Sequence, residues 1–301
     1  MKYKVQKEWL NITISNKFKT IKDFFDYYRI AKKTRYLMLT NEEVMVNHLV
    51  IKDEKTPLQK GQQLRLKIFK KEEIDYKPQY LFDMVIMYED EFCLIVDKPA
   101  GYIVHDERNS LANQVAYYYK EKGIHAPIRY IHRLDKETSG LVFFSKCSFF
   151  QPYFDDLLSK KEIERRYMAR VEGKIPWETY TCDLPIGKDR HNNNKFIAHK
   201  TGKPATTHFE NLEYYNDSQT IVLCTLETGR THQIRVHLSS LGYPIVNDAI
   251  YGKVTSNEDM ALCAYEITWP HPLTQEYYTC TLVDYDDDTI FISDEEIDDE
   301  Y

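Results

Sequence analysis

The sequence lacks the features that would place the chain in a membrane, on a secretory route or around a zinc ion. No apolar run approaches the length of a membrane-spanning helix, and the first residues contain no apolar signal-peptide segment. The six cysteines are scattered, without a C-x-x-C pair or the spacing of a zinc site. These absences predict a cytoplasmic protein whose cysteines are reduced thiols.

Glycine-rich loops that cradle phosphates, other metal-ligand spacings and internal repeats are also missing. We therefore expect no metal ion and no nucleotide or redox cofactor. Apolar residues make up 43% and charged residues 29% of the 301 residues, as in an ordinary globular protein. A chain of this length can hold one large domain, or a small domain and a larger one.

The net charge of −7 is unevenly distributed along the chain. From Asp284 onward there are ten acidic residues and no lysine or arginine, which leaves 40 basic side chains against 37 acidic ones in the rest. The main part is therefore slightly basic, and residues 284–301 are predicted to form an acidic tail. Charge alone does not identify a nucleic-acid-binding protein here.

Hydrophobic spacing divides the chain into a small N-terminal unit and a larger one. The N-terminal elements that we predict are a strand within 1–16, a helix capped by Thr20, a helix near 34–39, and strands at 44–47 and 63–69. The polar segment 70–80, which contains a proline, predicts a linker.

The larger unit alternates predicted strands with three helices. The strands are predicted at 85–88, 92–97, 141–144, 163–171, 204–214, 220–227, 262–268 and 277–283, and the helices at 110–122, 148–161 and 231–241. The aromatic stripe of helix 148–161 has the spacing of one buried helix face, which favours core packing over a base-stacking surface. The polar segment 186–204 predicts a loop that either grips a nucleic-acid backbone or is mobile.

The most chemically suggestive segment is 129–146. It packs His132, Arg133 and Asp135 into four positions, and the apolar run 141–144 that follows has the length of a strand. A carboxylate and a guanidinium on a loop held by a strand could form a functional site. The common alternative for an isolated Arg-x-Asp is a solvated turn with a surface ion pair.

The pattern His-Arg-Leu-Asp-x-x-Thr-Ser-Gly-Leu at 132–141 resembles the catalytic signature of the RluA-type pseudouridine synthases. Further segments are similar to that family in the same order, at 98–101, 166–169, 227–237 and 244–252. The resemblance covers roughly residues 80–283. It implies an isomerase acting on RNA, with a mixed, mostly antiparallel α+β catalytic domain that we place at residues 76–283.

The resemblance also implies roles for single residues. Pseudouridine formation breaks the bond between ribose and a ring nitrogen, turns the uracil and rejoins it through carbon 5, so it needs an ionised carboxylate and no cofactor. By resemblance Asp135 is this carboxylate, Arg235 keeps it ionised, Tyr167 stacks on the uracil or acts as a base, and Arg133 fills the gap left by a flipped base. Leu141 and Ile234 are expected to pack around the pocket, with packing in the core as the alternative for both. Lys98 approaches a phosphate or is a turn lysine, and His132 is expected to hold the loop.

Residues 1–75 resemble the alpha-L RNA-binding domain, in the pieces 32–35, 44–47 and 58–61. Lys32, Lys33 and Arg35 would then face phosphates, and their alternative is a solvated helix end. The chain departs from the family pattern at Asn247, where glycine precedes the aspartate in the usual motif, and at Cys263, which stands where histidine is usual.

These observations predict a monomeric RNA pseudouridine synthase that modifies a uridine in structured RNA, with ribosomal RNA as first choice and transfer RNA as second. One alternative is a non-catalytic RNA-binding or ribosome-assembly factor that retains the fold. A second alternative is a hydrolase that uses His132 and Asp135, although no serine or cysteine nucleophile motif accompanies them.

Overall fold

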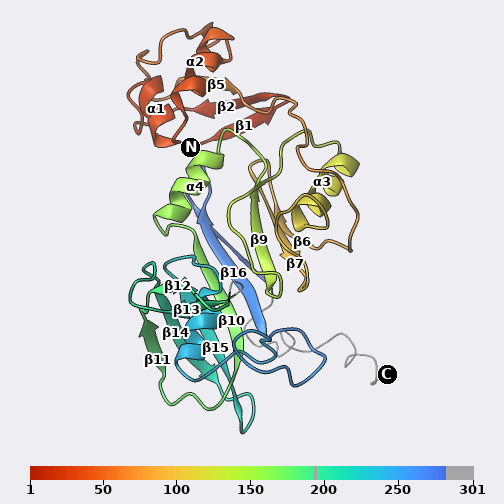
Figure 1. Ribbon diagram of the computed structural model, residues 1–301. Coiled ribbons are helices and arrows are strands. Elements are labelled where there is room, and N and C mark those ends of the chain that lie inside the picture. The colour runs from red at the N-terminus through yellow and green to blue at the C-terminus, as the bar shows by residue number, and fades with distance from the viewer. Residues whose placement is uncertain (193–194, 283–301) are drawn as a thin grey trace, which may run out of the picture.

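The computed structural model describes residues 1–192 and 195–282 and shows an elongated molecule with its N-terminal domain at one end (Figure 1). Within these residues the strands form a five-stranded sheet, a ten-stranded sheet and a two-stranded hairpin. The α+β class predicted from the sequence is confirmed. No helix of the described residues is long and apolar enough to cross a bilayer. The predicted acidic tail, residues 284–301, lies outside the described residues.

The N-terminal sheet is antiparallel and has the strand order β1-β2-β5-β3-β4. Its elements are β1 (Tyr3–Gln6), β2 (Trp9–Thr13), α1 (Ile21–Tyr27), α2 (Lys32–Thr40), β3 (Val44–Val46), β4 (Leu49–Val50) and β5 (Gln63–Lys67). Thr20 begins α1 as predicted, because its hydroxyl accepts from the N–H of Asp23 while the Asp23 carboxylate accepts from the N–H of Thr20. The single opening strand that was predicted is instead a hairpin, because the chain turns at Lys7 with φ +55°.

The ten-stranded sheet consists of two antiparallel halves joined by one parallel contact. Among the described strands the path runs β11-β14-β15-β10-β16-β9-β7-β6, with β17 on β16 and β8 on β9, and only β9 and β16 pair in parallel. The strands are β6 (Ile86–Glu89), β7 (Cys93–Lys98), β8 (Arg129–Tyr130), β9 (Ser139–Ser145), β10 (Glu164–Glu172), β11 (Thr179–Cys182), β14 (Thr207–Glu213), β15 (Gln219–Leu226), β16 (Leu262–Pro270) and β17 (Tyr277–Thr281).

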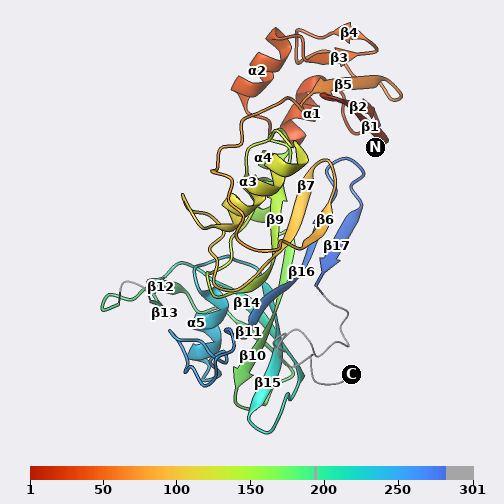
Figure 2. The ribbon, with the colours of Figure 1, turned by 90° about the vertical axis from the view of Figure 1, so that its right-hand side faces the viewer.

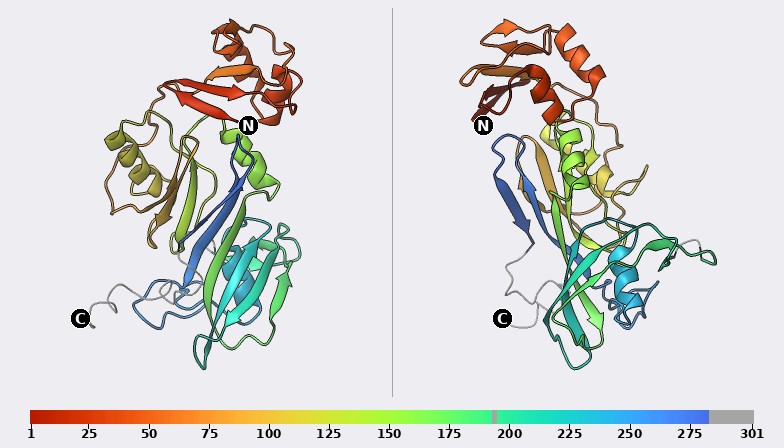
Figure 3. Two further views of the ribbon diagram at one scale, coloured as in Figure 1. Left: turned by 180° about the vertical axis from the view of Figure 1, so that it is seen from behind. Right: turned by 90° about the vertical axis from the view of Figure 1, so that its left-hand side faces the viewer.

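Successive side chains of the central strands point to opposite faces of this sheet, and each face packs against different helices. Leu94, Val96 and Phe144 belong to a core cluster with α3 (Leu111–Lys122) and α5 (Gln233–Ser240). Their neighbours Ile95 and Phe143 belong to a second cluster with α4 (Gln151–Ser159). Edge-on views show α3 and α5 on the same side of the long sheet (Figures 2 and 3). The aromatic stripe predicted to be core is indeed buried on α4.

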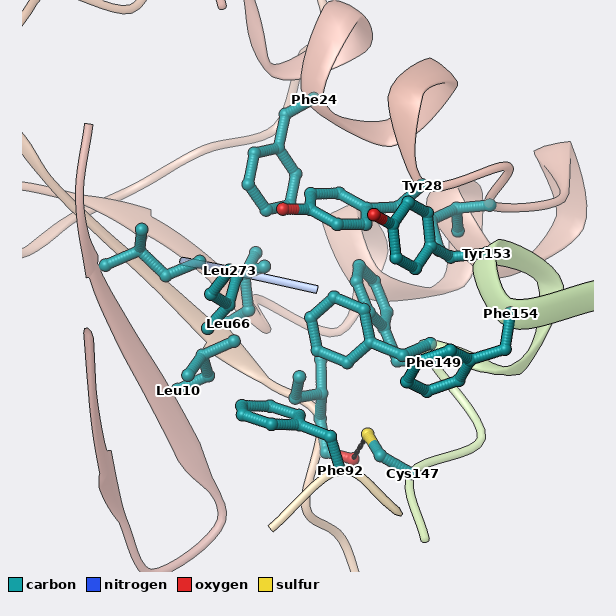
Figure 4. Close-up of a cluster of buried hydrophobic side chains, with 14 of the residues drawn as sticks. Leu10, Phe24, Tyr28, Leu66, Phe92, Cys147, Phe149, Tyr153, Phe154 and Leu273 are labelled. Carbon is teal, nitrogen blue, oxygen red and sulfur yellow. Dashed lines mark hydrogen bonds between the residues drawn. The ribbon is translucent and has the colours of Figure 1, made fainter. Parts of the chain in front are cut away.

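The N-terminal domain packs directly on the larger domain through the cluster that contains α4. Figure 4 shows Tyr28, which follows α1, beside Tyr153 of α4, with ring centroids 5.2 Å apart. The hydroxyl of Tyr28 donates to the carbonyl of Pro272 over 2.7 Å, and the N-terminal ammonium donates to the carbonyl of Leu273 over 2.7 Å. The two domains therefore share one apolar core.

The segment predicted as a linker, 70–80, lies along the larger domain. The N–H of Glu72 donates to the carbonyl of His125 over 2.9 Å, and the Asp75 carboxylate accepts from the N–H of Ile128 over 2.9 Å. The segment predicted as a loop, 186–204, was only partly a loop. It contains the hairpin of β12 (Ile186–Lys188) and β13 (Phe196–Ala198).

Candidate active site

Gly140 fixes where the Asp135 loop lies in the sheet. It is the second residue of β9, has φ +106°, and would bring a Cβ atom within 2.4 Å of the carbonyl oxygen of Ala264 in β16. Because glycine has no Cβ, the two strands can approach closely at this point. The loop that carries Asp135 therefore enters the sheet at the junction of its two halves.

A cavity of about 830 Å³ opens at this junction. It is lined by segments that are far apart in sequence, and it gathers five of the predicted site residues: Arg133, Asp135, Tyr167, Ile234 and Arg235. A smaller cavity of about 410 Å³ lies beside Tyr27 and Tyr153 at the contact of the two domains, and none of the predicted catalytic residues lines it. The larger cavity is therefore the candidate active site.

Asp135 is partly exposed to this cavity, with 24% of its side chain accessible. Its Oδ2 lies 3.6 Å from Nη1 of Arg235 and 3.9 Å from Nε2 of His232. Burial raises the pKa of Asp135 above its ordinary value, and the nearby His232 and Arg235 oppose this rise. Two donors thus face the carboxylate, while both contacts are longer than a normal hydrogen bond.

Arg235 is held mainly by a different carboxylate, that of Asp248. Nε and Nη2 of Arg235 each donate to Asp248 over 2.8 Å, and both side chains are almost completely buried. Burial works against the charge of Asp248, but Arg235 outweighs it and lowers the Asp248 pKa. The remaining Nη1 faces Asp135 and, at 3.5 Å, Glu137. The predicted Arg235–Asp135 pair is present, and at 3.6 Å it is the longest of the three carboxylate contacts of Arg235.

Tyr167 lines the cavity from β10, at a point where the strand is irregular. The register of β10 against β16 shifts between Arg166 and Tyr167, and such a bulge re-aims the side chains beside it. Tyr167 is 4% exposed. Burial raises its pKa, with Arg165 opposing, so the phenol is protonated near neutral pH. In this state it can stack on a base or donate a hydrogen bond.

His132 ties the loop to the sheet. Its Nε2 accepts a hydrogen bond from the N–H of Phe143 over 3.3 Å. Burial, with Arg165 nearby, lowers its pKa to about 3, so the ring is unprotonated near neutrality. This agrees with a structural role for His132. A hydrolase in which His132 works with Asp135 is not supported, because this ring is bonded to the backbone of β9.

Lys98 also supports the loop. Of its two predicted roles, the contact with a phosphate is corrected, whereas the turn lysine agrees with the contacts of its side chain. It is fully buried, and its Nζ donates to the carbonyls of Pro99 (3.0 Å), Tyr102 (2.8 Å) and Lys136 (3.3 Å). Burial lowers its pKa to about 8. Since Lys136 directly follows Asp135, Lys98 holds the backbone beside the candidate catalytic carboxylate.

The segments that build this cavity match a known protein family. Residues 92–240 match the family model described as RNA pseudouridylate synthase. The chain is 35% identical over 244 residues to the uncharacterized RNA pseudouridine synthase YhcT of Bacillus subtilis (strain 168), covering 78% of this chain and 78% of the relative. It is 33% identical over 233 residues to the ribosomal large subunit pseudouridine synthase D of Escherichia coli (strain K12), covering 76% of this chain and 70% of that one. The chain belongs to the RluA-type RNA pseudouridine synthases.

The fold agrees with this assignment. The human protein RNA Pseudouridylate Synthase Domain Containing 1 superposes on the synthase with a TM-score of 0.58 at 25% identity, covering 69% of this chain and 86% of that one. The synthase is therefore an isomerase that acts on RNA. The alternative of a non-catalytic RNA-binding factor is not supported by these matches.

Not every predicted site residue of the synthase lies at the cavity. Leu141 is fully buried in the core beside Phe143, so its predicted pocket role is corrected to core packing. Arg35 is also corrected, because its side chain is 11% exposed and pairs with Asp26 (2.6 Å) and Glu54 (3.5 Å). Lys32 and Lys33 are exposed at the start of α2, and their contact with RNA stays a prediction.

The synthase contains two site residues for which no role was predicted from the sequence. His232 faces Asp135, and Arg165 lines the cavity beside Tyr167. Both lie in segments that resemble the family or adjoin one, which was the available signal. The position of the His232 side chain depends on the backbone conformation, since His232 has φ +56° and begins α5 in a left-handed turn.

The two departures from the family pattern have structural explanations. Asn247 has φ +60°, a conformation that favours glycine and that asparagine tolerates. Its side chain accepts from the N–H groups of Thr255 (2.9 Å) and Ser256 (3.3 Å), so it also organises the following loop. Cys263 is buried opposite Ser139 in the parallel pairing, and burial raises its pKa to about 12, which makes it an unreactive core thiol.

Proposed function

We propose that the synthase isomerises a specific uridine of ribosomal RNA, with Asp135 as the carboxylate that attacks the nucleoside or stabilises its charge. The observation that supports this most strongly is that one cavity gathers Asp135, Tyr167 and Arg235 from three distant segments. Its volume of about 830 Å³ falls within the usual range of small-molecule pockets, so a flipped nucleoside can enter. Ribosomal RNA is preferred because the Escherichia coli relative is named a ribosomal large subunit pseudouridine synthase.

The exposed Arg133 supports the base-flipping part of the proposal. It lies at the cavity, where Nη1 is 3.0 Å from Nε2 of His105, and that ring stacks on Tyr130 with centroids 4.7 Å apart. Extruding a nucleotide costs a few kcal/mol, which phosphate contacts and a side chain entering the stack must offset. We assign Arg133 to that gap, and Tyr167 and Ile234 to the flipped base.

The N-terminal domain, residues 1–75, is proposed to add affinity and site choice. Its exposed Lys32 and Lys33 lie on α2, at the end of the molecule away from α5 (Figure 1). That distance separates them from the chemistry at Asp135, so their contribution is electrostatic contact with flanking RNA. Residues 76–283 carry the proposed catalytic domain.

Pseudouridine mapping of total RNA from cells with and without the protein tests the proposal. We expect one or a few uridines of ribosomal RNA to lose modification, and a plasmid copy of the gene to restore it. A plasmid copy with Asp135→Asn should leave the same sites unmodified. A loss of modification confined to transfer RNA would contradict the choice of substrate while leaving the assignment of Asp135 intact.

A further inference from the structure

His232 lies in an unusual position beside Asp135. It precedes α5 with φ +56° and ψ 22°, and its carbonyl accepts the first helical hydrogen bond from the N–H of Val236 over 2.8 Å. A left-handed residue other than glycine costs free energy and persists where the surroundings require it, often at functional sites. This turn brings the imidazole between the carboxylate of Asp135 and the hydroxyl of Tyr251.

The protons around Tyr251 decide which nitrogen of His232 carries a hydrogen. The Tyr251 oxygen accepts from the backbone N–H of Phe196 over 2.9 Å, and it lies 2.9 Å from Nδ1 of His232. Since that N–H already donates to the phenol oxygen, the phenol proton is free to point at Nδ1. Nδ1 is then an acceptor, and in a neutral imidazole the proton must sit on Nε2.

The position of Asp135 favours the same tautomer independently. Nε2 of His232 faces Oδ2 of Asp135 at 3.9 Å. A lone pair on Nε2 would face a carboxylate unfavourably, whereas an N–H would attract it. Burial lowers the pKa of His232, with Asp135 opposing and Arg235 adding to the decrease, so the ring is neutral.

We propose that His232 is a positioning residue of this synthase, which presents Nε2–H to the Asp135 carboxylate and has its tautomer fixed by Tyr251 and the Phe196 backbone. The inference rests on the proposed role of Asp135. The contact of 3.9 Å shortens when RNA binds, as catalytic contacts often do. Asp248 occupies Nε and Nη2 of Arg235, so that only Nη1 of this residue is left to face Asp135, at 3.6 Å, and His232 supplies the second donor.

The side chains around Asp135 are mostly charged, but few of them donate a hydrogen bond to its carboxylate. The ionisable groups that face Asp135 and His232 from the neighbouring elements are Arg235, Glu137, Asp248, Lys98, Tyr167 and Tyr251. Glu137 repels the Asp135 charge, Asp248 is paired with Arg235, and Lys98 donates to three carbonyls. A neutral N–H donor therefore orients the carboxylate and favours its ionised form.

The first test reads the tautomer directly and needs no activity. Two-bond ¹H–¹⁵N spectra of the ¹⁵N-labelled protein distinguish a protonated Nε2 from a protonated Nδ1, and His232→Asn identifies the signal. We expect Nε2–H in the wild type at neutral pH and a partial change to Nδ1–H in Tyr251→Phe. A wild-type ring protonated on Nδ1 would overturn the proposal.

The second test measures single-turnover rates on a transcript that contains the mapped uridine. His232→Asn tolerates the left-handed turn and should slow the reaction about 10-fold to 100-fold, the range for losing a hydrogen bond to a charged group. His232→Gln, whose amide can present an N–H, should recover part of the rate. RNA affinity should stay unchanged in both, and His125→Gln, an exposed histidine on the α3–β8 connection, serves as the neutral control.

If His232 acts through Asp135, two further measurements should show it: the pH dependence of the rate and the rate of a double variant. Removing His232 removes the N–H that favours the ionised carboxylate, so the pKa of Asp135 should rise and the acid limb of the rate profile should move to higher pH. Tyr251→Phe should slow the reaction less than His232→Asn, and the double variant should match His232→Asn alone, because Tyr251 acts through His232. An unshifted profile or additive losses would overturn the proposal.

Asp135→Asn is measured alongside to separate the two hypotheses. If it is inactive while His232→Asn keeps the wild-type rate and profile, the inference fails and the proposed function stands. If Asp135→Asn retains substantial turnover, the proposed function fails and takes the inference with it, whichever tautomer the spectra report.

Discussion

Two buried clusters on the long sheet have opposite chemistry. The first joins the N-terminal domain to α4 and consists mainly of aromatic and aliphatic side chains, Tyr28 among them (Figure 4). Tyr28 and Trp269 of this cluster have no exposed surface. The second surrounds the cavity and holds Arg235 and Asp248, which are 1% and 0% exposed. Tyr28 and Trp269 in the first cluster and the Arg235–Asp248 pair in the second are removed from water, and their contributions to the protein differ accordingly.

This difference indicates which cluster stabilises the fold and which one serves the candidate active site. Apolar burial stabilises a fold by about 25 cal/mol per Å², so the first cluster contributes directly to the free energy of unfolding. Buried charges lose their hydration, and their mutual attraction often does no more than offset that loss. We infer that the charged cluster is retained for the geometry of Asp135, while the aromatic cluster fixes the two domains together.

The largest expected effect is the loss of reaction rate when Asp135 in the charged cluster is replaced. Asp135→Asn keeps the size of the side chain and removes its charge, so single-turnover pseudouridine formation should fall at least about 1,000-fold. Because burial raises the pKa of Asp135 in the folded state, the stability linked to this group is lost as pH rises through that pKa. The variant should therefore be as stable as the wild type, or more so, in denaturant unfolding at neutral pH. A clear loss of stability would contradict this comparison.

Arg235→Met should damage both stability and activity. Removing one member of a buried ion pair leaves Asp248 uncompensated and costs about 3–5 kcal/mol of unfolding free energy. The loss should shrink below the ordinary Asp pKa, because Asp248 has a lowered folded pKa and its stabilising contribution disappears as pH falls through it. Urea unfolding at several pH values measures this.

The same variant tests how Arg235 acts on Asp135. Without the guanidinium the already raised pKa of Asp135 should rise further, so activity should be low near neutrality and recover partly in alkaline buffer. RNA affinity should be nearly unchanged. Arg235→Lys is the matched control, because it keeps the charge but not the two-pronged contact with Asp248. Weakened RNA binding with an unshifted pH profile would make Arg235 a phosphate contact instead.

Substitution of Tyr28 tests the aromatic cluster. Tyr28→Ala removes a buried ring that lies 4.7 Å from Phe24 and 5.1 Å from Phe150, and it should cost about 3–4 kcal/mol. Tyr28→Phe loses only the hydrogen bond to Pro272 and should cost about 1 kcal/mol. The single-turnover rate of the folded variants should match the wild type. Separate unfolding transitions for the two domains in the wild type would show that they are not one cooperative unit.

How much the sequence predicted depends on whether a feature is local. The N-cap at Thr20, the helix predicted at 110–122 and the strand predicted at 141–144 follow from short-range rules, and the structure confirms them. The grouping of Asp135, Tyr167 and Arg235 came from motif resemblance. Periodicity could not supply it, because a parallel contact between β9 and β16 brings them together.

The errors have a common physical cause. Lys98, Arg35 and Leu141 have the residue types of ligands or pocket walls, but tertiary contacts engage each of them elsewhere. The role of His232 depends on a left-handed backbone conformation and on a hydrogen bond between Phe196 and Tyr251, which are distant in sequence. Spacing patterns carry no information about such contacts.

The smallest expected effect belongs to the exposed face of the N-terminal domain, and it separates RNA contact from folding. Lys32 and Lys33 occupy the first turn of α2, where positive charge opposes the helix dipole, so Lys32→Gln/Lys33→Gln should not destabilise the protein. If both bind phosphates, the slope of log affinity against log salt should flatten by roughly 0.7–0.9 for each phosphate that is no longer neutralised.

Arg35→Gln is the matched control: it breaks the pairs with Asp26 and Glu54, so it should lower stability by about 1 kcal/mol or less and leave the salt slope unchanged. Filter binding of the ribosomal transcript between low and moderate salt measures the slopes. An unchanged slope in the double variant would make these lysines a solvated face, and the RNA-binding surface of the synthase would then have to lie around the cavity.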